Sequence, residues 1–515
     1  MISARNLLAG LGLFMSAALF LLLKQRKSRV HTKTHPPGPP AWPIFGNIFD
    51  LGAIPHHTFY KLKEKYGPVI WLKLGYTNTL VIQSAEAAAE LFKNHDLAFS
   101  DRKVPLVLTA HHYNQGSMAI GRYGPNWSML RRLCSSKIMI TKQLDQTAVL
   151  RQKCMDDMIK YIEEDVAEAH AQGESGEIKV AHYLFIMTFN LIGNLVLSRD
   201  LVSPRSIDGH EFYDAMNKFM KWAGTPNVAD FFPFLKWLDP QGIMRNMVQD
   251  MGQVMRIVEK FVKERTEERR SGRKKTNDFL DALLEYEGDG KDEPDVISDQ
   301  NIRTIILEMF LAGSETASAT IEWAMTELLR DPVVMGRATE ELHQVVGPQR
   351  KVEESDIDHL PYLQAVIKET LRLHPVAPLL LPRNTLEDTN FMGYLIPKDT
   401  QVFVNAWAIG RDPDSWEDPM AFKPERFLGS NIEYRGQNFE LIPFGAGRRI
   451  CVGISLAHRV LHLGLASLLH CFEWELGRNY TPETIDMSER GGLTASKLKP
   501  LKAKPKRVGR TTNVK

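Results

Sequence analysis

Apolar residues recur at helical spacing along most of the chain, and alternating, strand-like patterns are few. Apolar side chains three and four positions apart predict helices, whereas short β-branched runs predict strands. Helices are predicted at 84–93, 126–139, 146–171, 179–198, 248–270, 297–330, 333–346, 361–373 and 454–471. Strands are predicted at 69–75, 79–84 and 400–407. The pattern therefore indicates a mainly α protein with a minor β region.

The first apolar stretch predicts a membrane anchor. Residues 7–23 contain no charged side chain over 17 positions, which is the short end of a bilayer span. A basic segment follows at 24–29, against a single arginine, Arg5, before the stretch. The positive-inside rule then places the rest of the chain in the cytosol. A cleaved signal peptide is the alternative, but it would carry its basic residues before the apolar stretch.

Behind this anchor, at 1–23, the sequence predicts a linker, one domain and a tail. Five prolines between His35 and Pro43 favour a stiff, extended spacer, so the linker is placed at 24–43. No second linker of this kind interrupts residues 44–501, which are expected to form one domain although a chain of 515 residues usually has several. Residues 502–515, rich in lysine and arginine, are expected to form a basic tail.

Charge and cysteine content exclude several classes of function. The net charge of +2 is too small a bias to indicate nucleic-acid binding. The four cysteines, Cys134, Cys154, Cys451 and Cys471, match neither a zinc ribbon nor a CxxC redox pair. So few thiols in so long a chain argue against a disulfide scaffold and fit a reducing compartment.

One cysteine, Cys451, lies in the stretch FGAGRRICVG, residues 444–453. Two cations, Arg448 and Arg449, precede it and a predicted helix follows, and both features favour the thiolate form. A thiolate in this setting could serve as a nucleophile or as a metal ligand. Glycines let the backbone turn tightly and let a flat ligand approach closely. Here they are Gly445, Gly447 and Gly453.

Two histidines on the following helix, His458 and His462, are spaced to share one face. As catalytic partners of Cys451 they would point away along the helix. As a metal-binding pair they lack an evident third ligand. They are therefore interpreted as side chains that fill a helix face.

The positions of Phe444, Gly447, Arg449, Cys451 and Gly453 are similar to the haem-binding signature of the cytochrome P-450 family, the haem-thiolate monooxygenases. The resemblance extends from the anchor and the proline-rich segment to about residue 501. It implies a single triangular, mostly α catalytic domain that binds haem b, with Cys451 as the proximal iron ligand. Thiolate ligation favours O–O bond cleavage, so the implied reaction uses O₂ to convert a C–H bond into an alcohol.

Two further segments resemble motifs that brace the cysteine loop in this family. Glu369 and Arg372 lie in KETLRLHP, and Arg426 lies in FKPERF. By itself, an acid three positions before an arginine on a helix is usually an ordinary surface pair. The resemblance implies instead a buried charge network among the three residues, because a buried arginine requires a partner of opposite charge.

The segment FLAGSETASATIEW, within the longest predicted helix, resembles the family's oxygen-activation segment. Ala312 and Gly313 are then expected to leave room over the flat cofactor. Thr316 is expected to hydrogen-bond on the oxygen side, and Glu315 to help deliver protons. Alone, the pattern would fit a solvated carboxylate and a threonine bonded to its own helix. Ala317 departs from the family, which often has a second hydroxyl there.

Haem carries two propionates, which need cationic partners. Trp127 and Arg131 resemble the family's Trp-x-x-x-Arg motif, and Arg383 lies where the family has another propionate contact. With Arg449, three arginines are expected to bind the acids through charge-assisted hydrogen bonds. Trp127 as plain core filling is the simpler alternative.

The chain has no Rossmann or flavin motif, so its electrons must come from a partner protein. The resemblance implies an NADPH-dependent cytochrome reductase on the endoplasmic reticulum membrane, with cytochrome b5 as a further candidate. A basic surface would attract such an acidic partner. The candidate residues for this surface are Arg131, Arg132, Lys137, Lys142 and Arg448.

The segments expected to line the substrate pocket are apolar, which indicates a small apolar substrate. They are residues 106–121, 309–313, 374–382 and 491–496. By overall similarity the chain resembles plant family members that hydroxylate terpenoids, in the geraniol-hydroxylase and iridoid-oxidase group. The alternatives are a phenylpropanoid, alkaloid or fatty-acid hydroxylase, a haem-thiolate isomerase or dehydratase, and a haem sensor.

Overall fold

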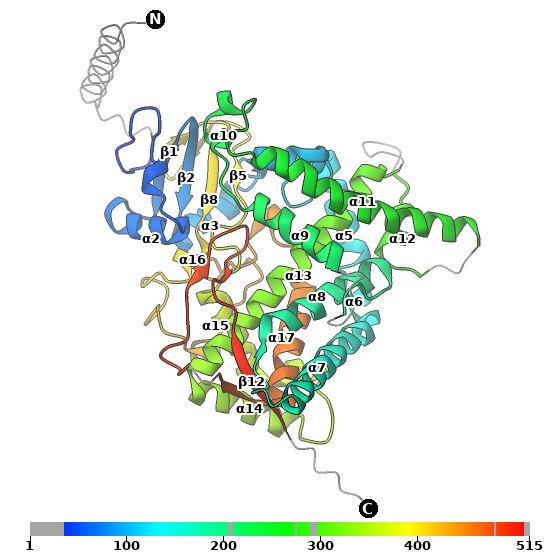
Figure 1. Ribbon diagram of the computed structural model, residues 1–515. Helices are drawn as coiled ribbons and strands as arrows, with labels where there is room; N and C mark the ends of the chain where they lie inside the picture. Colours follow the sequence, from blue (N-terminus) through cyan, green and yellow to red (C-terminus); the bar gives the residue numbers. More distant parts are fainter. Residues whose placement is uncertain (1–34, 204–209, 273–275, 289–295, 478–479, 509–515) are drawn as a thin grey trace, which may run out of the picture.

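The computed structural model describes residues 35–203, 210–272, 276–288, 296–477 and 480–508. Helices dominate it, and the largest sheet lies on one side of the molecule (Figure 1). The predicted mainly α fold with a minor β region is therefore confirmed. The predicted anchor at 7–23 and most of the predicted linker lie outside the described residues.

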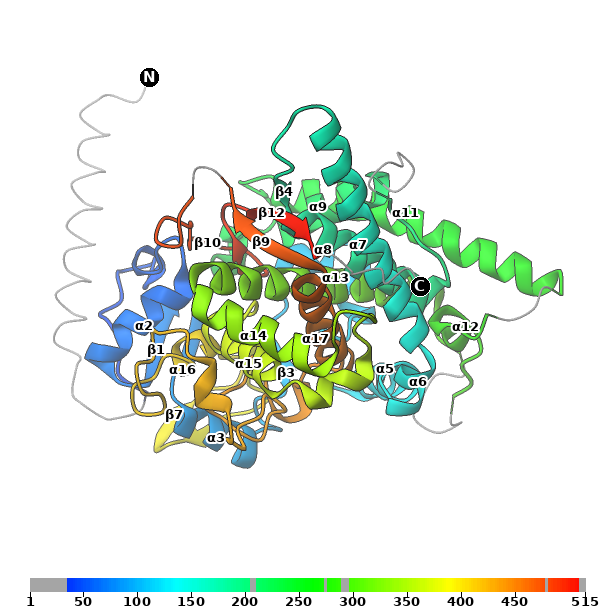
Figure 2. The ribbon, with the colours of Figure 1, turned by 90° about the horizontal axis from the view of Figure 1, so that it is seen from below.

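The long helix α13, Asp299–Arg330, passes through the middle of the helical part of the molecule (Figures 1 and 2). Ser298 caps its N-terminus by accepting a hydrogen bond from the Asn301 amide. Side chains on every face of α13 are buried, because other helices pack around it and share one hydrophobic core. These helices are α8 (Val180–Leu197), α11 (Ile243–Arg270), α15 (Pro361–Leu373) and α17 (Ile454–Cys471).

Each helix predicted from the pattern is present, with ends that agree within five residues. The pattern did not predict α2, which buries only two side chains, or α9. The further helices of eight or more residues are α2 (Pro55–Tyr66), α3 (Ala85–Asn94), α5 (Pro125–Lys137), α7 (Ala148–Ala171), α9 (His210–Ala223) and α14 (Pro332–Val345). The shorter ones are α4 (Tyr113–Gly116), α6 (Thr141–Gln146), α10 (Val228–Phe231), α12 (Phe279–Leu284) and α16 (Ala406–Ile409).

The largest sheet has five strands in the order β1-β2-β8-β5-β3, and only the β2–β8 pair is parallel. The predicted strand 400–407 ends early, because Asn405 caps α16 by accepting a hydrogen bond from the Ala408 amide. The five strands of this sheet are β1 (Val69–Leu74), β2 (Thr77–Ile82), β3 (Asp101–Arg102), β5 (Arg383–Asn384) and β8 (Gln401–Val404).

The prediction of a basic tail from residue 502 is wrong for its first six residues. They form β12 (Lys502–Arg507), which pairs with β9 (Phe472–Leu476) and β4 (Ile178–Lys179). Ala503 and Pro505 are buried, whereas Lys502 and Lys506 are exposed and Lys504 is half-buried. This alternation is typical of a half-buried strand, and the lysine-rich composition concealed it. The remaining strands are β6 (Thr389–Phe391), β7 (Tyr394–Ile396), β10 (Glu489–Arg490) and β11 (Ser496–Lys497).

The contact between α8 and α13 depends on Gly313. By length and composition α8 could cross a membrane, but 83% of it is buried inside the described protein, so it is a core helix. A Cβ atom on Gly313 would lie 2.5 Å from Cδ1 of Ile192 in α8. Gly313 therefore lets these two helices pack closely.

We expect Gly313→Ala to lower the free energy of unfolding by about 1–2 kcal/mol, because it overpacks this contact. The matched control is Gly336→Ala in α14, where the new Cβ meets no atom within 4 Å. That change should be neutral or stabilise the protein by up to about 1 kcal/mol. Urea unfolding measures both variants. Ile192→Val removes the opposing methyl group, so adding it to Gly313→Ala should restore the stability. If the double variant is no more stable than Gly313→Ala alone, the packing argument is contradicted.

Candidate active site

The loop that carries Cys451 is a tight turn before α17. The Cys451 amide donates a hydrogen bond to the Phe444 carbonyl over 2.9 Å, which closes the loop. Gly447 has φ of +67°, and a side chain there would collide with the carboxylate of Asp96. Gly453 is the residue before α17, and the atom nearest to a Cβ placed there is the Cys451 sulfur, at 3.8 Å. Gly447 thus serves both a positive φ and a close approach to Asp96, whereas a side chain at Gly453 would make only an ordinary contact.

The thiol of Cys451 lies deep in the protein, yet its side chain has exposed surface, so it borders an internal space. Burial raises the pKa of the thiol, while a Gly453 hydrogen bond and the charge of Arg131 act in the opposite direction. The expectation that Arg448 and Arg449 favour the thiolate is not met, because these side chains interact with Asp96 and with backbone carbonyls. A metal ion at the sulfur would supply the positive charge that the thiolate needs.

Four arginines gather near the loop, and they carry more positive charge than the acids around them offset. They are Arg102, Arg131, Arg383 and Arg449. Arg102 and Arg383 face each other across β3 and β5, a position where like charges are unfavourable. Among the described residues, this group forms an ion pair with one carboxylate. It belongs to Asp96, which lies 3.3 Å from the Arg383 guanidinium.

Burial is the main cause that lowers the pKa of these arginines, to about 10 for Arg383 and about 9 for Arg449. Repulsion from the neighbouring arginines adds to the effect on Arg102 and Arg449. Buried charges of one sign are costly unless a partner neutralises them. The cluster therefore fits a ligand with two carboxylates, which is what the haem propionates would provide.

The hydrogen bonds of the cluster fix its members against the cysteine loop. Arg131 donates to the Ile450 carbonyl over 2.7 Å, and Arg383 donates to the Ala446 carbonyl over 3.0 Å. Arg449 donates to the Ser100 and Gly121 carbonyls and lies 4.0 Å from the centre of the Trp127 ring. The indole N–H of Trp127 donates to the Met118 carbonyl. Trp127 therefore acts at least partly as core filling, which was the simpler alternative.

Sequence reasoning missed two members of this site, Asp96 and Arg102. Asp96 accepts a hydrogen bond from the Arg448 amide over 2.8 Å, and Arg102 donates to the Ala119 and Leu381 carbonyls. Both lie in an unremarkable stretch at 95–102, with no fixed spacing to the other motifs. The pairing of β3 with β5 brings Arg102 to the loop, and Asp96 lies in the connection between α3 and β3.

The predicted network of Glu369, Arg372 and Arg426 is present and buried. Arg372 and Glu369 form two hydrogen bonds of 2.7 Å, and neither side chain is exposed. Nε of Arg426 donates to the same carboxylate over 3.1 Å. The network ties α15 to the short 3₁₀ turn Pro424–Phe427, so it is not an ordinary surface pair.

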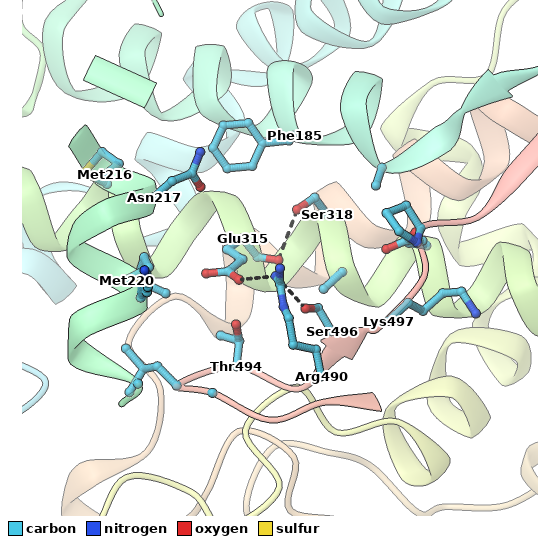
Figure 3. Close-up of a pocket in the computed structure, with 18 of the residues that line it drawn as sticks. Phe185, Met216, Asn217, Met220, Glu315, Ser318, Arg490, Thr494, Ser496 and Lys497 are labelled. Atoms are coloured by element: carbon cyan, nitrogen blue, oxygen red, sulfur yellow. Dashed lines mark hydrogen bonds and ion pairs between the residues drawn. The ribbon is translucent and has the colours of Figure 1, made fainter. Parts of the chain in front are cut away.

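The two α13 side chains predicted to take part in oxygen activation, Glu315 and Thr316, point in different directions. The Thr316 hydroxyl donates to the Ala312 carbonyl over 2.5 Å, so the back-bonded arrangement considered from the sequence is the one observed. Glu315 lies 3.8 Å from Arg490 of β10, across a cavity (Figure 3). Burial raises the pKa of Glu315, while a Thr494 hydrogen bond and the Arg490 charge act in the opposite direction.

The cavity beside Glu315 has a volume of about 770 Å³ and lies between α8, α9, α13 and the β10–β11 hairpin. Its lining includes the predicted segment 491–496 and, from 309–313, Phe310 and Leu311. It includes no residue of the predicted segments 106–121 and 374–382, and neither Cys451 nor Thr316. This cavity therefore reaches the Glu315 side of α13.

The histidines of α17 fill a helix face, as interpreted from the sequence. Nδ1 of His458 accepts or donates a hydrogen bond with the Tyr434 hydroxyl at 2.6 Å, and Nδ1 of His462 lies 2.5 Å from the His458 carbonyl. Burial, followed by the charge of His458, lowers the pKa of His462 to about 3. The buried imidazole is therefore neutral in the folded protein.

This burial predicts a pH dependence of stability. The unfolded chain binds a proton at this imidazole near pH 6.5, whereas the folded protein does so only near pH 3. The contribution of His462 to the free energy of unfolding is thus complete above pH 6.5. It decreases by about 1.4 kcal/mol per pH unit as the pH falls toward 3. Urea unfolding from pH 7 to pH 5 should show a shallower decline in His462→Leu. An equally steep decline in the wild type and in His462→Leu would contradict this prediction. His359→Gln, which replaces an exposed histidine, serves as the control.

The surface cations proposed for partner docking differ in exposure. Arg132, Lys137, Lys142 and Arg448 are exposed, whereas Arg131 is half-buried and belongs to the arginine cluster. The four exposed residues come from α5, α6 and the cysteine loop.

Comparisons with known proteins agree with this geometry. The Cytochrome P-450 family model matches residues 36–503. Iridoid oxidase from Catharanthus roseus is 57% identical over 95% of each chain. Geraniol 8-hydroxylase from the same plant is 43% identical over 92% of this chain and 94% of its own. 7-ethoxycoumarin O-deethylase from Helianthus tuberosus is 43% identical over 91% and 93%.

The family match covers the cysteine loop, the buried Glu369 network and the arginine cluster, and the relatives align over nearly their whole length. Haem-thiolate iron is the cofactor that this family implies, and the residues around Cys451 fit it. The chain therefore belongs to the cytochrome P-450 family and is a P-450 monooxygenase.

Proposed function

We propose that this monooxygenase hydroxylates a small apolar terpenoid of the monoterpenoid or iridoid type at a membrane. The observation that carries the proposal is the 57% identity to an iridoid oxidase along 95% of the chain. The similarity to a geraniol 8-hydroxylase supports the same substrate class. The similarity to a 7-ethoxycoumarin O-deethylase makes an aromatic ether the second candidate.

In this proposal Cys451 is the proximal ligand of haem b, and Phe444, Gly447 and Gly453 shape the loop that presents it. A thiolate-bound haem iron supplies the activation of O₂ and the insertion of one oxygen atom into a C–H bond, while the other leaves as water. The cationic partners of the propionates are Arg102, Arg131, Arg383 and Arg449. Charge-assisted hydrogen bonds to the propionates would offset the mutual repulsion of these arginines.

Ala312 and Thr316 form the opposite side of the site in this proposal, and Glu315, whose side chain faces the neighbouring cavity, would supply protons from there. Ala312 is exposed although α13 crosses the core, so this part of the helix borders an internal space. Burial raises the pKa of Glu315, which suits this carboxyl to donate and recover protons. Thr316 can release its bond to the Ala312 carbonyl by rotating its hydroxyl, which makes it available to pass a proton on.

We expect Thr316→Ala to lower the amount of product formed per NADPH consumed by at least about tenfold, because proton transfer by one positioned group typically contributes about 10²–10⁴-fold. Peroxide release should rise in proportion. The control is Thr320→Ala, one turn further along α13, whose hydroxyl is also bonded to its own helix. Unchanged coupling in Thr316→Ala would remove Thr316 from the proton path.

An exposed apolar patch supports the membrane assignment. Trp42, Phe49 and Trp237 are 60%, 68% and 80% exposed. The Phe45 ring lies against the rings of Phe49 and Phe232, at centroid distances of 5.2 and 5.9 Å, so the segments near 42–49 and 228–238 form one surface. A patch of this kind is typical of a membrane or partner contact. We place the protein at the endoplasmic reticulum membrane, with a single-pass anchor at 7–23 and a cytosolic catalytic domain.

Electrons would come from an NADPH-dependent reductase, with cytochrome b5 as a second possible donor. The exposed cations Arg132, Lys137, Lys142 and Arg448 would attract an acidic partner and raise its rate of association.

The test uses microsomes that contain the full-length protein and a plant NADPH-dependent reductase. Monoterpenoid alcohols, iridoids, sesquiterpenoids and 7-ethoxycoumarin are supplied in turn, and products are identified by mass spectrometry. Hydroxylated or further oxidised monoterpenoids that form only with NADPH would support the proposal. Correctly formed haem with no terpenoid product, but with deethylation of the coumarin, would establish the second candidate instead.

A further inference from the structure

A cluster of three metal-ligating side chains, His56, His57 and Glu489, lies apart from the cysteine loop. Both histidines are in the first turn of α2, and Glu489 begins β10, 433 positions after His56. Nε2 of His56 lies 2.7 Å from Oε2 of Glu489, and Nε2 of His57 lies 3.4 Å from the same oxygen. The fold therefore brings two imidazoles and one carboxylate to a single point.

The donor set fits zinc. Two nitrogens and one oxygen, all within 4.8 Å of one another, match the three-ligand sites that bind Zn²⁺ and keep a fourth position for water. Tetrahedral bonds of about 2.0–2.2 Å place the ligand atoms roughly 3.3–3.5 Å apart. The distance from His57 to Glu489 already has this value. His56 would need to move away from Glu489 by less than about 1 Å.

The second imidazole has an unused nitrogen. Nε2 of His57 is buried and makes no hydrogen bond of good geometry within the part of the chain that the structure describes. Buried polar atoms are normally paired, so an unpaired nitrogen facing a carboxylate is a notable exception. The His57 side chain is nevertheless 36% exposed, which gives an ion a route from solvent.

The surroundings set the strength of such a site. The indole N–H of Trp407 donates to Oε1 of Glu489 over 3.3 Å, which leaves Oε2 for a metal. Arg411 stacks on the Trp407 ring at 3.8 Å, and its charge opposes a cation. One carboxylate offsets this charge, and the site has no thiolate. We therefore expect weaker binding than in structural zinc sites.

We propose that His56, His57 and Glu489 form a Zn²⁺ site that ties α2 to the β10–β11 hairpin. Arg490, the next residue of that hairpin, forms the ion pair with Glu315 across the cavity. A bound ion would hold one wall of that cavity in place. The site needs neither the cysteine loop nor a particular substrate.

The test uses the full-length, haem-loaded protein, purified without a histidine tag and treated with a chelator. Calorimetric titration with Zn²⁺ should show one ion per chain, and the thermal midpoint should rise with Zn²⁺ concentration. His57→Gln and Glu489→Gln should each weaken the affinity by at least about tenfold, because each removes one of three ligands.

The matched control is His359→Gln, which removes an exposed histidine outside the cluster and should bind Zn²⁺ as the wild type does. Haem absorbance shows that each variant is folded. The proposal is overturned if the wild type shows no saturable binding, or if His57→Gln binds Zn²⁺ with wild-type affinity. The proposal also fails if His57→Gln and Glu489→Gln lose no more Zn²⁺ affinity than the control His359→Gln. Such a result would indicate diffuse binding to surface histidines.

Discussion

Replacing Cys451 with serine is expected to abolish the red-shifted absorption band of the carbonyl complex and to lower turnover by at least about 10³-fold, because the hydroxyl cannot replace a thiolate as an electron-donating ligand. The change alters one atom in a loop whose backbone bond from the Cys451 amide to the Phe444 carbonyl does not involve the side chain. The fold should therefore survive. The spectrum is recorded on protein that has been reduced with dithionite and treated with carbon monoxide.

The control for this experiment is Cys471→Ser. Cys471 is a half-exposed free cysteine at the end of α17, 20 residues after Cys451. It should keep both the red-shifted band and the turnover. Retention of the band in Cys451→Ser would show that another residue provides the ligand, and the assignment of the cysteine loop would fail.

The second large effect is expected for Glu369→Gln, which should lower the free energy of unfolding by about 3–5 kcal/mol and reduce haem incorporation. The change keeps the shape of the side chain but removes the charge that neutralises Arg372 and Arg426. Because Glu369 and Arg372 have no exposed surface, water cannot compensate for the loss. Urea unfolding and the haem-to-protein absorbance ratio measure the two effects.

An exposed ion pair provides the comparison. Glu473 and Lys506 lie 3.9 Å apart on β9 and β12, with side chains 67% and 75% exposed. Glu473→Gln should change the unfolding free energy by less than about 1 kcal/mol, since solvent screens such a pair. Equal losses in the two variants would mean that the Glu369 network is not more important than a surface contact.

The sequence predicted the helices well because their signal is local. A helix that packs on a core must repeat apolar residues every three to four positions, and this repeat is visible in α13, α15 and α17. The weakly patterned α2 buries only His56 and Phe59, so the pattern did not reveal it. Likewise, the alternation in β12 is masked by its lysines.

The sequence by itself determined the reactive cysteine, the glycines that let its loop turn, and the acid and arginine of α15, because each depends on residues a few positions apart. Only the tertiary structure decided that Asp96 and Arg102 join the loop, that Gly313 faces Ile192, and that Glu315 turns toward Arg490. These contacts join segments that are distant in sequence. Charge and shape complementarity between such segments arises only when the chain is packed, and no local periodicity encodes it.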